Sequence, residues 1–451
     1  MAEKLLPPVN RAMRTLDRAF FKKTFAISAA RIFNNKHIAQ CRKDLERSHD
    51  ALGMDRLMNV TQDPSLELAK EGRRCILLRP DIKANDSSTW GKTVTELVES
   101  QRVGVIPYDL ELDYDYWSYR DIMSSILPLD EQKDLPTGFT VVGHVAHLNL
   151  REPFLPYKHL IGQVILDKGG NIRTVINKID TVGEESEYRT FSYEVLAGPD
   201  DLNVEVKEQD CFFHFNYANV YWNSRLHTEH GRLVSTFKEG DVVCDVMAGV
   251  GPFAVPAGKR RVFVWANDLN PESYASLEAN ITRNKVDKFV RPYNRDGRMF
   301  IREAVAELYH SDHSVQLQTK VSRSKKERPQ MKTYRQPKVF NHFVMNLPAT
   351  AITFLPSFIG AYSLAQIPPS EPMPKIHVYC FDAKEDDNAA AFQHICDEIS
   401  RQLEFKFKPG DEEKEGEVQI WDVRDVAPGK RMFCATFRLP FEVAHRPIPE
   451  L

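Results

Sequence analysis

The sequence predicts an α/β protein whose C-terminal half forms a doubly wound sheet, and three observations support this fold class. From about residue 211 onward, strand-like and helix-like segments alternate along the chain. Within that region, residues 244–271 read CDVMAGVGPFAVPAGKRRVFVWANDLNP: an apolar strand, a turn with glycines, and a second strand that ends on an acidic residue. The last two strand-like segments are joined only by APGK, which is too short for a crossover helix, so we expect them to pair as an antiparallel hairpin.

Length and composition indicate a multidomain globular protein. A chain of 451 residues exceeds one ordinary domain. The 42% hydrophobic and 27% charged residues are typical of soluble globular proteins. No uncharged apolar run reaches the roughly 18 residues that a membrane helix needs. The seven cysteines are scattered without a CxxC motif, which argues against a disulfide framework and a zinc site. We therefore expect neither a membrane nor a metal as a partner.

Residues 1–117 are predicted to form a small mixed N-terminal domain. The first 43 residues hold ten Lys and Arg against two acids, so they are either a mitochondrial presequence or an amphipathic helix. The apolar face of that helix would carry Leu16, Phe20, Phe21 and Phe25. Strand material near 73–80, a helix around 92–101 and a candidate junction at 106–117 complete this part.

Residues 118–207 are predicted to form a β-rich module. Strand-like segments punctuated by glycine turns cover 139–150, 162–179 and 188–198. In the second of these, KGGNI stands where a hairpin turn is expected.

Residues 208–451 are predicted to form the cofactor-binding domain. Its candidate strands are VVCDVMA, VFVWAND, VFNHFVMNL, KIHVYCFD, VQIWDVRDV and KRMFCATFRLP, and its helices include PESYASLEANITRNK and SFIGAYSLA. Two segments look inserted: the acidic loop 410–417, interpreted as solvated, and the basic stretch 311–338. In the latter, residues 320–338 hold eight Lys and Arg against Glu327, so it is either a solvated loop or a contact for RNA phosphates.

Acidic residues that end successive strands indicate the kind of cofactor. Asp245 precedes a turn in which Gly249 and Gly251 allow a ligand to approach the backbone closely. Asp268 ends the second strand, where it can accept hydrogen bonds from ribose hydroxyls, and Asp296 is available to an exocyclic amine. Three carboxylates suit a cationic adenosine derivative without phosphates, which favours S-adenosylmethionine. The alternative is that these residues only cap the following helices.

The same region departs from the dinucleotide-binding motif, since Ala254 occupies the place of the third glycine of GxGxxG. The fourth strand ends in NLPA, a form of the tetrad found in methyltransferases that modify nitrogen in bases. Ala349 stands where versions acting on exocyclic amines carry an aromatic residue. Asn346 remains as a hydrogen-bond partner for base or cofactor. A parallel sheet closed by an antiparallel hairpin is also the arrangement expected of a class I, Rossmann-like methyltransferase.

With these motifs in place, the chain resembles the tRNA (guanine-37-N1)-methyltransferases of archaea and eukaryotes. The matching segments cover most of residues 118–451 and are YRTFSYEVLAG, NVYWNSRLHTEHGRLV, DVMAGVGPFAVPA, NDLNP, FVMNLPA and VRDVAPGKRMFCATFRLP. The N-terminal part matches more loosely the domain that contacts the tRNA elbow. The resemblance implies methyl transfer from S-adenosylmethionine to N1 of the guanosine that follows the anticodon.

The resemblance also implies roles for individual residues. Glu229 matches the general base, Arg189 the arginine that holds O6, and Tyr221 a support for the flipped base. An ordinary carboxylate is about five pKa units too weak to deprotonate guanine N1, about 7 kcal/mol, so burial must raise its pKa. Because Arg189 and Glu229 lie in different predicted domains, the site would be complete only when these dock. The resemblance implies cofactor contacts for His230, Asp245, Gly249, Gly251, Asp268, Leu269, Asp296, Gly297 and Asn346.

Other interpretations stay open. Glu229 and Arg232 can form an ordinary helical ion pair, Arg189 can pair with Glu187 or Glu194, and Tyr221 can belong to the core. Alternative functions are the aminocarboxypropyl transferase of the wybutosine pathway, a non-catalytic RNA-binding protein and a small-molecule methyltransferase. We further expect a monomer, contacts with the tRNA anticodon loop and body, and a location in cytoplasm, nucleus and mitochondrial matrix.

Overall fold

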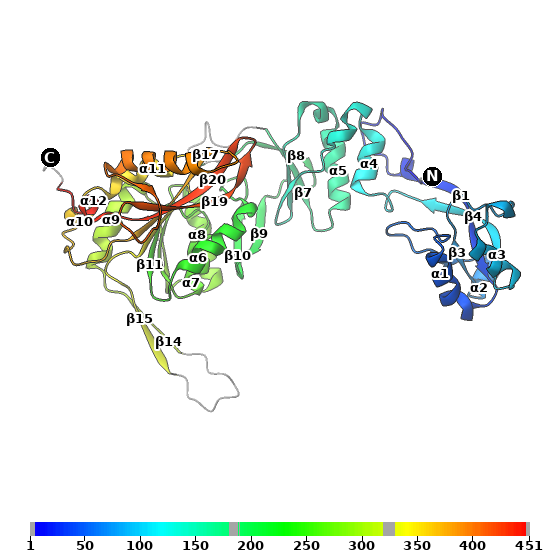
Figure 1. Cartoon of the computed structure of the whole chain (residues 1–451), viewed down its shortest axis with the longest axis horizontal. Helices are drawn as coiled ribbons and strands as arrows, with labels where there is room; N and C mark the ends of the chain where they lie inside the picture. Colours follow the sequence, from blue (N-terminus) through cyan, green and yellow to red (C-terminus); the bar gives the residue numbers. More distant parts are fainter. Residues whose placement is uncertain (1–4, 180–187, 189, 319–329, 448–451) are drawn as a thin grey trace. The chain divides into compact units, whose positions relative to one another are not determined.

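The computed structural model describes residues 5–179, 188, 190–318 and 330–447 (Figure 1). Its contacts divide the chain into two compact units. The first comprises residues 1–140, 146–177 and 195–199, and the second comprises residues 141–145, 178–194 and 200–451. The three-part division at 118 and 208 stays a prediction.

The first unit begins with an antiparallel sheet in the order β2-β3-β1-β4. Its strands are β1 (Lys23–Ile32), β2 (Val60–Gln62), β3 (Arg74–Leu77) and β4 (Val103–Leu112), and its helices are α1 (Ile38–Arg47), α2 (Leu66–Lys70) and α3 (Lys92–Glu99). The predicted strand near 73–80 and helix around 92–101 are confirmed as β3 and α3.

The helix predicted over Leu16–Phe25 is wrong. Only a short 3₁₀ turn, Ala19–Phe21, precedes the ten-residue strand β1. This strand pairs with β4 along its whole length, from Lys23 opposite Leu112 to Ile32 opposite Val103. The segment 106–117, predicted as a junction, forms part of strand β4 as far as Leu112. In β1, pairing with this distant segment outweighs the helical spacing of the nearby apolar residues.

The rest of the first unit contains α4 (Tyr119–Ile126) and α5 (Lys158–Lys168). The hairpin predicted over 162–179 is wrong, since α5 occupies its first half and the strand β7 (Thr174–Lys178) follows. Leu160, Ile161, Val164 and Ile165 are all buried, and their spacing is helical. The strands β6 (Val145–Leu148), β7 and β8 (Tyr193–Ala197) lie in one sheet, whereas β5 (Thr140–Val142) lies mostly in the stretch 141–145 of the second unit.

The second unit is built on an eight-stranded sheet in the order β13-β12-β11-β16-β17-β20-β19-β18. Its strands are β11 (Val242–Asp245), β12 (Phe263–Asn267), β13 (Val290–Tyr293), β16 (His342–Met345), β17 (Lys375–Ala383), β18 (Lys408–Pro409), β19 (Glu417–Ala427) and β20 (Lys430–Arg438). The pairs among β13, β12, β11, β16 and β17 are parallel, whereas β17, β20 and β19 pair antiparallel. The doubly wound sheet with its C-terminal hairpin is thus confirmed.

Helices cover both faces of this sheet, as Figure 1 shows for α6, α7 and α8 (green) against α11 (orange). Their bounds are α6 (His227–Thr236), α7 (Ala254–Lys259), α8 (Pro271–Asn284), α9 (Gly297–His310), α10 (Ala361–Leu364), α11 (Ala389–Leu403) and α12 (Phe441–Ala444). Strands buried on both faces need continuous apolar runs, and VVCD and FVWAN of β11 and β12 are fully buried.

Two hairpins extend the second unit. β9 (Asn203–Glu208) and β10 (Cys211–Asn216) pair antiparallel beside α8, where Asn280 and Asn284 accept hydrogen bonds from the backbone of β10. In the predicted basic insert, β14 (Ser314–Gln318) pairs with β15 (Met331–Arg335). Figure 1 shows this second hairpin standing out from the sheet. Glu239 holds it, accepting hydrogen bonds from Lys332 and Tyr334.

Candidate active site

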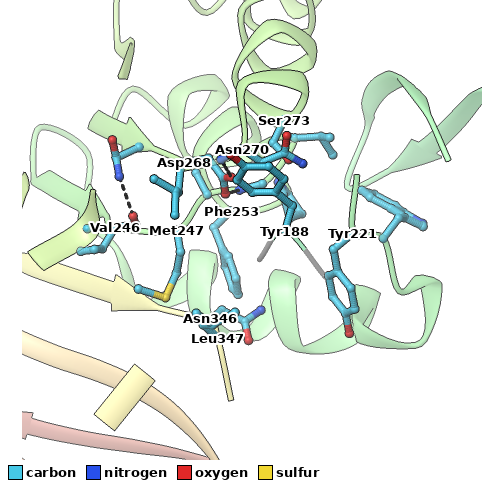
Figure 2. A pocket seen from close by; sticks show the side chains of 18 of the residues that line it. Tyr188, Tyr221, Val246, Met247, Phe253, Asp268, Asn270, Ser273, Asn346 and Leu347 are labelled. Atoms are coloured by element: carbon cyan, nitrogen blue, oxygen red, sulfur yellow. Dashed lines mark hydrogen bonds between the residues drawn. The ribbon is translucent and has the colours of Figure 1, made fainter. Parts of the chain in front are cut away.

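One cavity of the second unit collects residues from most of the predicted motifs. It is lined by Tyr188, Tyr221, Trp222, Asn223, Leu226, His230, Val246, Met247, Ala248, Gly249, Val250, Pro252, Phe253, Asn267, Asp268, Leu269, Asn270, Ser273, Asp296, Gly297, Arg298, Asn346, Leu347 and Phe354. In Figure 2, Asp268 and Asn346 lie at opposite sides of the cavity. The carboxyl ends of parallel strands meet at this edge of the sheet, which is where such folds bind ligands.

The turn after β11 shapes one wall of the cavity. Gly249 and Gly251 have φ values of 55° and 96°, in the region that favours glycine. A Cβ atom on Gly251 would lie 2.8 Å from Leu277 Cδ1 and 2.9 Å from Val255 Cγ2. Asp268 fastens the turn from the neighbouring strand, because its Oδ2 accepts a hydrogen bond from Gly249 N at 2.7 Å.

Two of the three predicted acidic residues also bind backbone N–H groups, but only Asp296 caps a helix as the capping interpretation proposed, since the N-cap of α8 is Asn270. Asp268 Oδ1 accepts from Asn270 N, and Asp296 Oδ1 accepts from the N–H groups of Arg298 and Met299 at the start of α9. Both residues nevertheless line the cavity. A carboxylate offers about four acceptor sites, and each of these two residues accepts two backbone hydrogen bonds, so acceptor capacity remains for a ligand. Burial raises the pKa of Asp268.

Asp245 is different because it serves no backbone group. Its side chain is fully buried at the end of β11, and neither carboxylate oxygen has a hydrogen-bond partner within the described part of the chain. Burial, and then the charge of Asp268, raise its pKa well above the usual value. Asn346 Oδ1 is likewise buried without a described partner. Unpaired buried acceptors are costly, so both atoms are candidates to receive a ligand's donor groups.

Glu229 lies in the first turn of α6 and is 5% exposed. Its carboxylate accepts hydrogen bonds from Arg232 Nε and Nη2, both at 2.6 Å, and from the hydroxyl of Tyr379 on β17 at 2.7 Å. The buried carboxylate is thus found as predicted, but so is the ion pair of the alternative interpretation. Glu229 itself does not line the cavity, whereas the next residue, His230, does. Nδ1 of His230 lies 2.5 Å from Glu208 Oε1, which accepts its hydrogen.

The comparisons with known proteins agree with this architecture. Residues 204–310 match the TRM5/TYW2 methyltransferase domain, and residues 119–201 match the TYW2 N-terminal domain. The tRNA (guanine(37)-N(1))-methyltransferase of Neurospora crassa is 51% identical over 448 residues, which are 97% of this chain and 94% of the relative. That of Schizosaccharomyces pombe is 42% identical over 458 residues, 98% of each chain.

The chain belongs to the tRNA (guanine(37)-N(1))-methyltransferase family. Among solved structures, Trm5b from Pyrococcus abyssi superposes with a TM-score of 0.57 at 23% identity, over 91% of this chain and 99% of that one. The complex of aTrm5 and tRNALeu superposes with a TM-score of 0.59 at 21% identity, over 91% and 100%. These two structures support the fold: the class I methyltransferase architecture predicted from the sequence is confirmed.

The structure brings together most of the predicted site residues of this family member. Tyr221, His230, Gly249, Asp268, Leu269, Asp296, Gly297 and Asn346 line one cavity. Glu229, Asp245 and Gly251 are not among the lining residues, but each is adjacent in the sequence to one that is: His230, Val246 and Val250 respectively. Arg189 lies outside the described residues, so its place opposite Glu229 stays a prediction.

Other residues of the site were missed by the sequence analysis. Tyr188, Phe253 and Phe354 add aromatic surface to the cavity, and Figure 2 shows the first two beside Asp268 and Tyr221. Phe253 stands in the DVMAGVGPF motif and could have been found there. Tyr379 could not, because only the packing of β17 against α6 brings its hydroxyl to Glu229.

None of the helices in the described part of the chain has the length and apolar character of a membrane span. In the same residues, no cluster of three or more His, Cys, Asp or Glu side chains is arranged to hold a metal ion. All seven cysteines are free and buried.

Proposed function

We propose that this chain transfers the methyl group of S-adenosylmethionine to N1 of guanosine 37 in tRNA, with Glu229 as the base that removes the N1 proton. The observation that carries the proposal is the convergence of four strand-end motifs and the NVYWNSRLHTEH segment on one cavity. The curated relatives, whose name states this activity, match along nearly the whole chain.

The residues around the cavity fit the cofactor. Its ammonium group needs an acceptor, and Asp245 is a buried carboxylate without a described partner. Asp268 keeps acceptor capacity for hydroxyls, and the turn at Gly249 and Gly251 lets a ligand reach the backbone. When bound, S-adenosylmethionine supplies an electrophilic methyl group on a sulfonium. His230, Leu269, Asp296 and Gly297 complete the proposed cofactor contacts.

Guanine must lose the proton on N1 before N1 can accept the methyl group. Glu229 is shielded from solvent, but its three hydrogen bonds stabilise the negative charge. We therefore infer that entry of guanosine turns the carboxylate away from Arg232 toward the cavity. Asn346, with an unpaired Oδ1, orients the guanine, Tyr221 stacks on it, and Arg189 meets the charge that develops on O6.

The description of the matched domain, TRM5/TYW2, is compatible with the aminocarboxypropyl alternative. The relatives that are 40–51% identical are named as guanine-37 methyltransferases, which favours methyl transfer. A non-catalytic RNA-binding protein would not need the buried carboxylates of Glu229 and Asp245. For the finer partner expectations, the basic stretch 311–338, whose strand β15 carries Lys332 and Arg335, supports contact with the tRNA body. The monomeric state and the three compartments remain proposals, to be checked by light scattering and by imaging of fluorescent fusions.

The experiment is incubation of the purified protein with labelled cofactor and tRNA transcripts that differ only at nucleotide 37. We expect label only in the G37 transcript, and a mass increase of one methyl group located on N1. Equal labelling of G37 and A37 transcripts, or addition of an aminocarboxypropyl group, would contradict the proposal.

A further inference from the structure

A bulge in β19 changes which side chain faces α6. In the pairing with β20, Trp421 lies opposite Cys434 and Arg424 lies opposite Met432, with an irregularity between Asp422 and Arg424. Residues two apart on a strand share a face, so Met432 and Cys434 point to the same side of the sheet. A regular ladder would place Val423 opposite Met432. The extra residue places Arg424 there instead, which is how bulges redirect side chains near active sites.

The face that Arg424 joins is the one packed against α6. Tyr379 of β17 lies opposite Cys434 and donates its hydroxyl hydrogen to Glu229. Farther along, the guanidinium of Arg232 lies 4.9 Å from the ring centroid of Trp421. Arg424 is the next residue of β19 on this face, and the groups that act on it electrostatically include Arg225 and Tyr221 from the segment preceding α6. Arg225 stands in the segment that supplies Tyr221, Trp222, Asn223 and Leu226 to the cavity lining, and its charge acts on Arg424.

Neither arginine forms an ion pair within the described residues, although the charge of Asp425 also acts on Arg424. Nη1 of Arg424 is buried with no hydrogen-bond partner there, while its Nε donates to the backbone oxygen of Asp425 at 3.0 Å. The Arg225 side chain is exposed, and only its backbone N–H has a described bond, to Asn223. Burial, and then the charge of Arg225, lower the pKa of Arg424.

This arrangement is unfavourable in the free protein. A buried donor without a partner is unfavourable, and two like charges near each other repel. Among the described residues, most other arginines of this unit are paired, as Arg283 is with Glu205 and Arg438 with Glu413. An anion between the two guanidiniums would satisfy the free donors and cancel the repulsion. Guanidinium groups match the oxygens of a phosphate in a two-pronged geometry.

We propose that Arg424 and Arg225 together bind a backbone phosphate of the tRNA strand whose base enters the cavity past Tyr221. The inference rests on the proposed function for the identity of the ligand. It adds a residue from the C-terminal hairpin, Arg424, to the substrate-binding surface. The contact holds the strand in place and carries no base specificity, since phosphate contacts position a nucleic acid without reading it.

The test is the salt dependence of tRNA binding by the full chain, measured by fluorescence anisotropy with a G37 transcript and an A37 transcript. The variants are Arg424→Gln, Arg225→Gln and the double variant. Each contact to a phosphate contributes about one unit to the slope of log K against log salt, so each single variant is expected to lower the slope by about 1. Both transcripts should lose affinity by the same factor, and Arg424→Lys should retain the slope.

The matched control is Arg401→Gln on α11, because Arg401 already pairs with Glu398. It should leave the slope unchanged. Cofactor affinity, measured by calorimetry, should be the same in all variants and shows that the fold is intact. An unchanged slope in the double variant would overturn the inference, as would a loss confined to the G37 transcript, which would assign base reading to these arginines. If the wild type binds tRNA with the predicted slope but methylates neither transcript, the proposed function fails while the phosphate site stands.

Discussion

The ion pair between Glu229 and Arg232 gives the sharpest prediction about stability. The carboxyl side chain is 5% exposed and the guanidinium 27% exposed. Replacing Arg232 by Met leaves a buried charge with only the Tyr379 hydroxyl as partner. Removing one member of a buried pair costs about 3–5 kcal/mol, and partial exposure places this case near 3 kcal/mol. Glu229→Gln keeps the shape and leaves the guanidinium access to water, so we expect a loss of about 1 kcal/mol.

The double variant should lose less than the sum of the single variants, because no unpaired charge remains. We expect a coupling free energy of about 2 kcal/mol from the double-mutant cycle. The assay is urea unfolding followed by circular dichroism, with stability taken from the midpoints of transitions that keep the same slope.

The chain offers a matched control on α11. Glu398 and Arg401 have the same spacing and the same two-pronged contact, but their side chains are 31% and 68% exposed. An exposed pair contributes at most about 1 kcal/mol, so its cycle should give a coupling well below that of the buried pair. Equal couplings in the two cycles would refute the reasoning that burial makes the Glu229–Arg232 pair important.

Three further predictions concern protonation. Because burial raises the pKa of Asp245, binding of a cationic cofactor should release a proton, and the affinity should increase as pH rises. Calorimetry in buffers of different ionisation enthalpy measures the proton release, and Asp245→Asn should abolish it. Hydrogen bonds from Tyr334, Arg261 and Lys332 lower the pKa of Glu239 from 4.5 to about 2. The stabilisation of the β14–β15 hairpin by Glu239 should therefore be complete above pH 4.5 and be lost between pH 4.5 and 2. Hydrogen exchange in β14 and β15 should become faster over that range. Native protein should react slowly with a thiol reagent and release all seven thiols only in denaturant, because the cysteines are buried and burial raises their pKa, to about 12 for Cys75.

The parallel strands at the core of the second unit could be predicted from the sequence. Strands such as VVCD and FVWAN are short apolar runs, which a strand buried on both faces requires. The acidic residues at the strand ends were found for the same reason, since the carboxyl ends of parallel strands converge on one edge. The N-terminal strand β1 was missed because the spacing of its apolar residues also suits a helix. Only its pairing with β4, some eighty residues away, decides the outcome.

The parts of the site that depend on register could not be predicted from the sequence. One extra residue in β19 brings Arg424 to the face of the sheet that packs against α6, and the local composition does not indicate this bulge. Tyr379 meets Glu229 only because β17 places it opposite Cys434, under α6. The hydrogen bond from Tyr379 to Glu229 joins positions 150 residues apart in the sequence.

The removal of the N1 proton by Glu229 is tested most directly by a single-turnover methylation of the G37 transcript with the wild type and with Glu229→Gln. The amide keeps the shape of the side chain and cannot take a proton, so methyl transfer should fall below detection while cofactor affinity stays nearly the same. Matching single-turnover rates for the two proteins would show that another group accepts the proton.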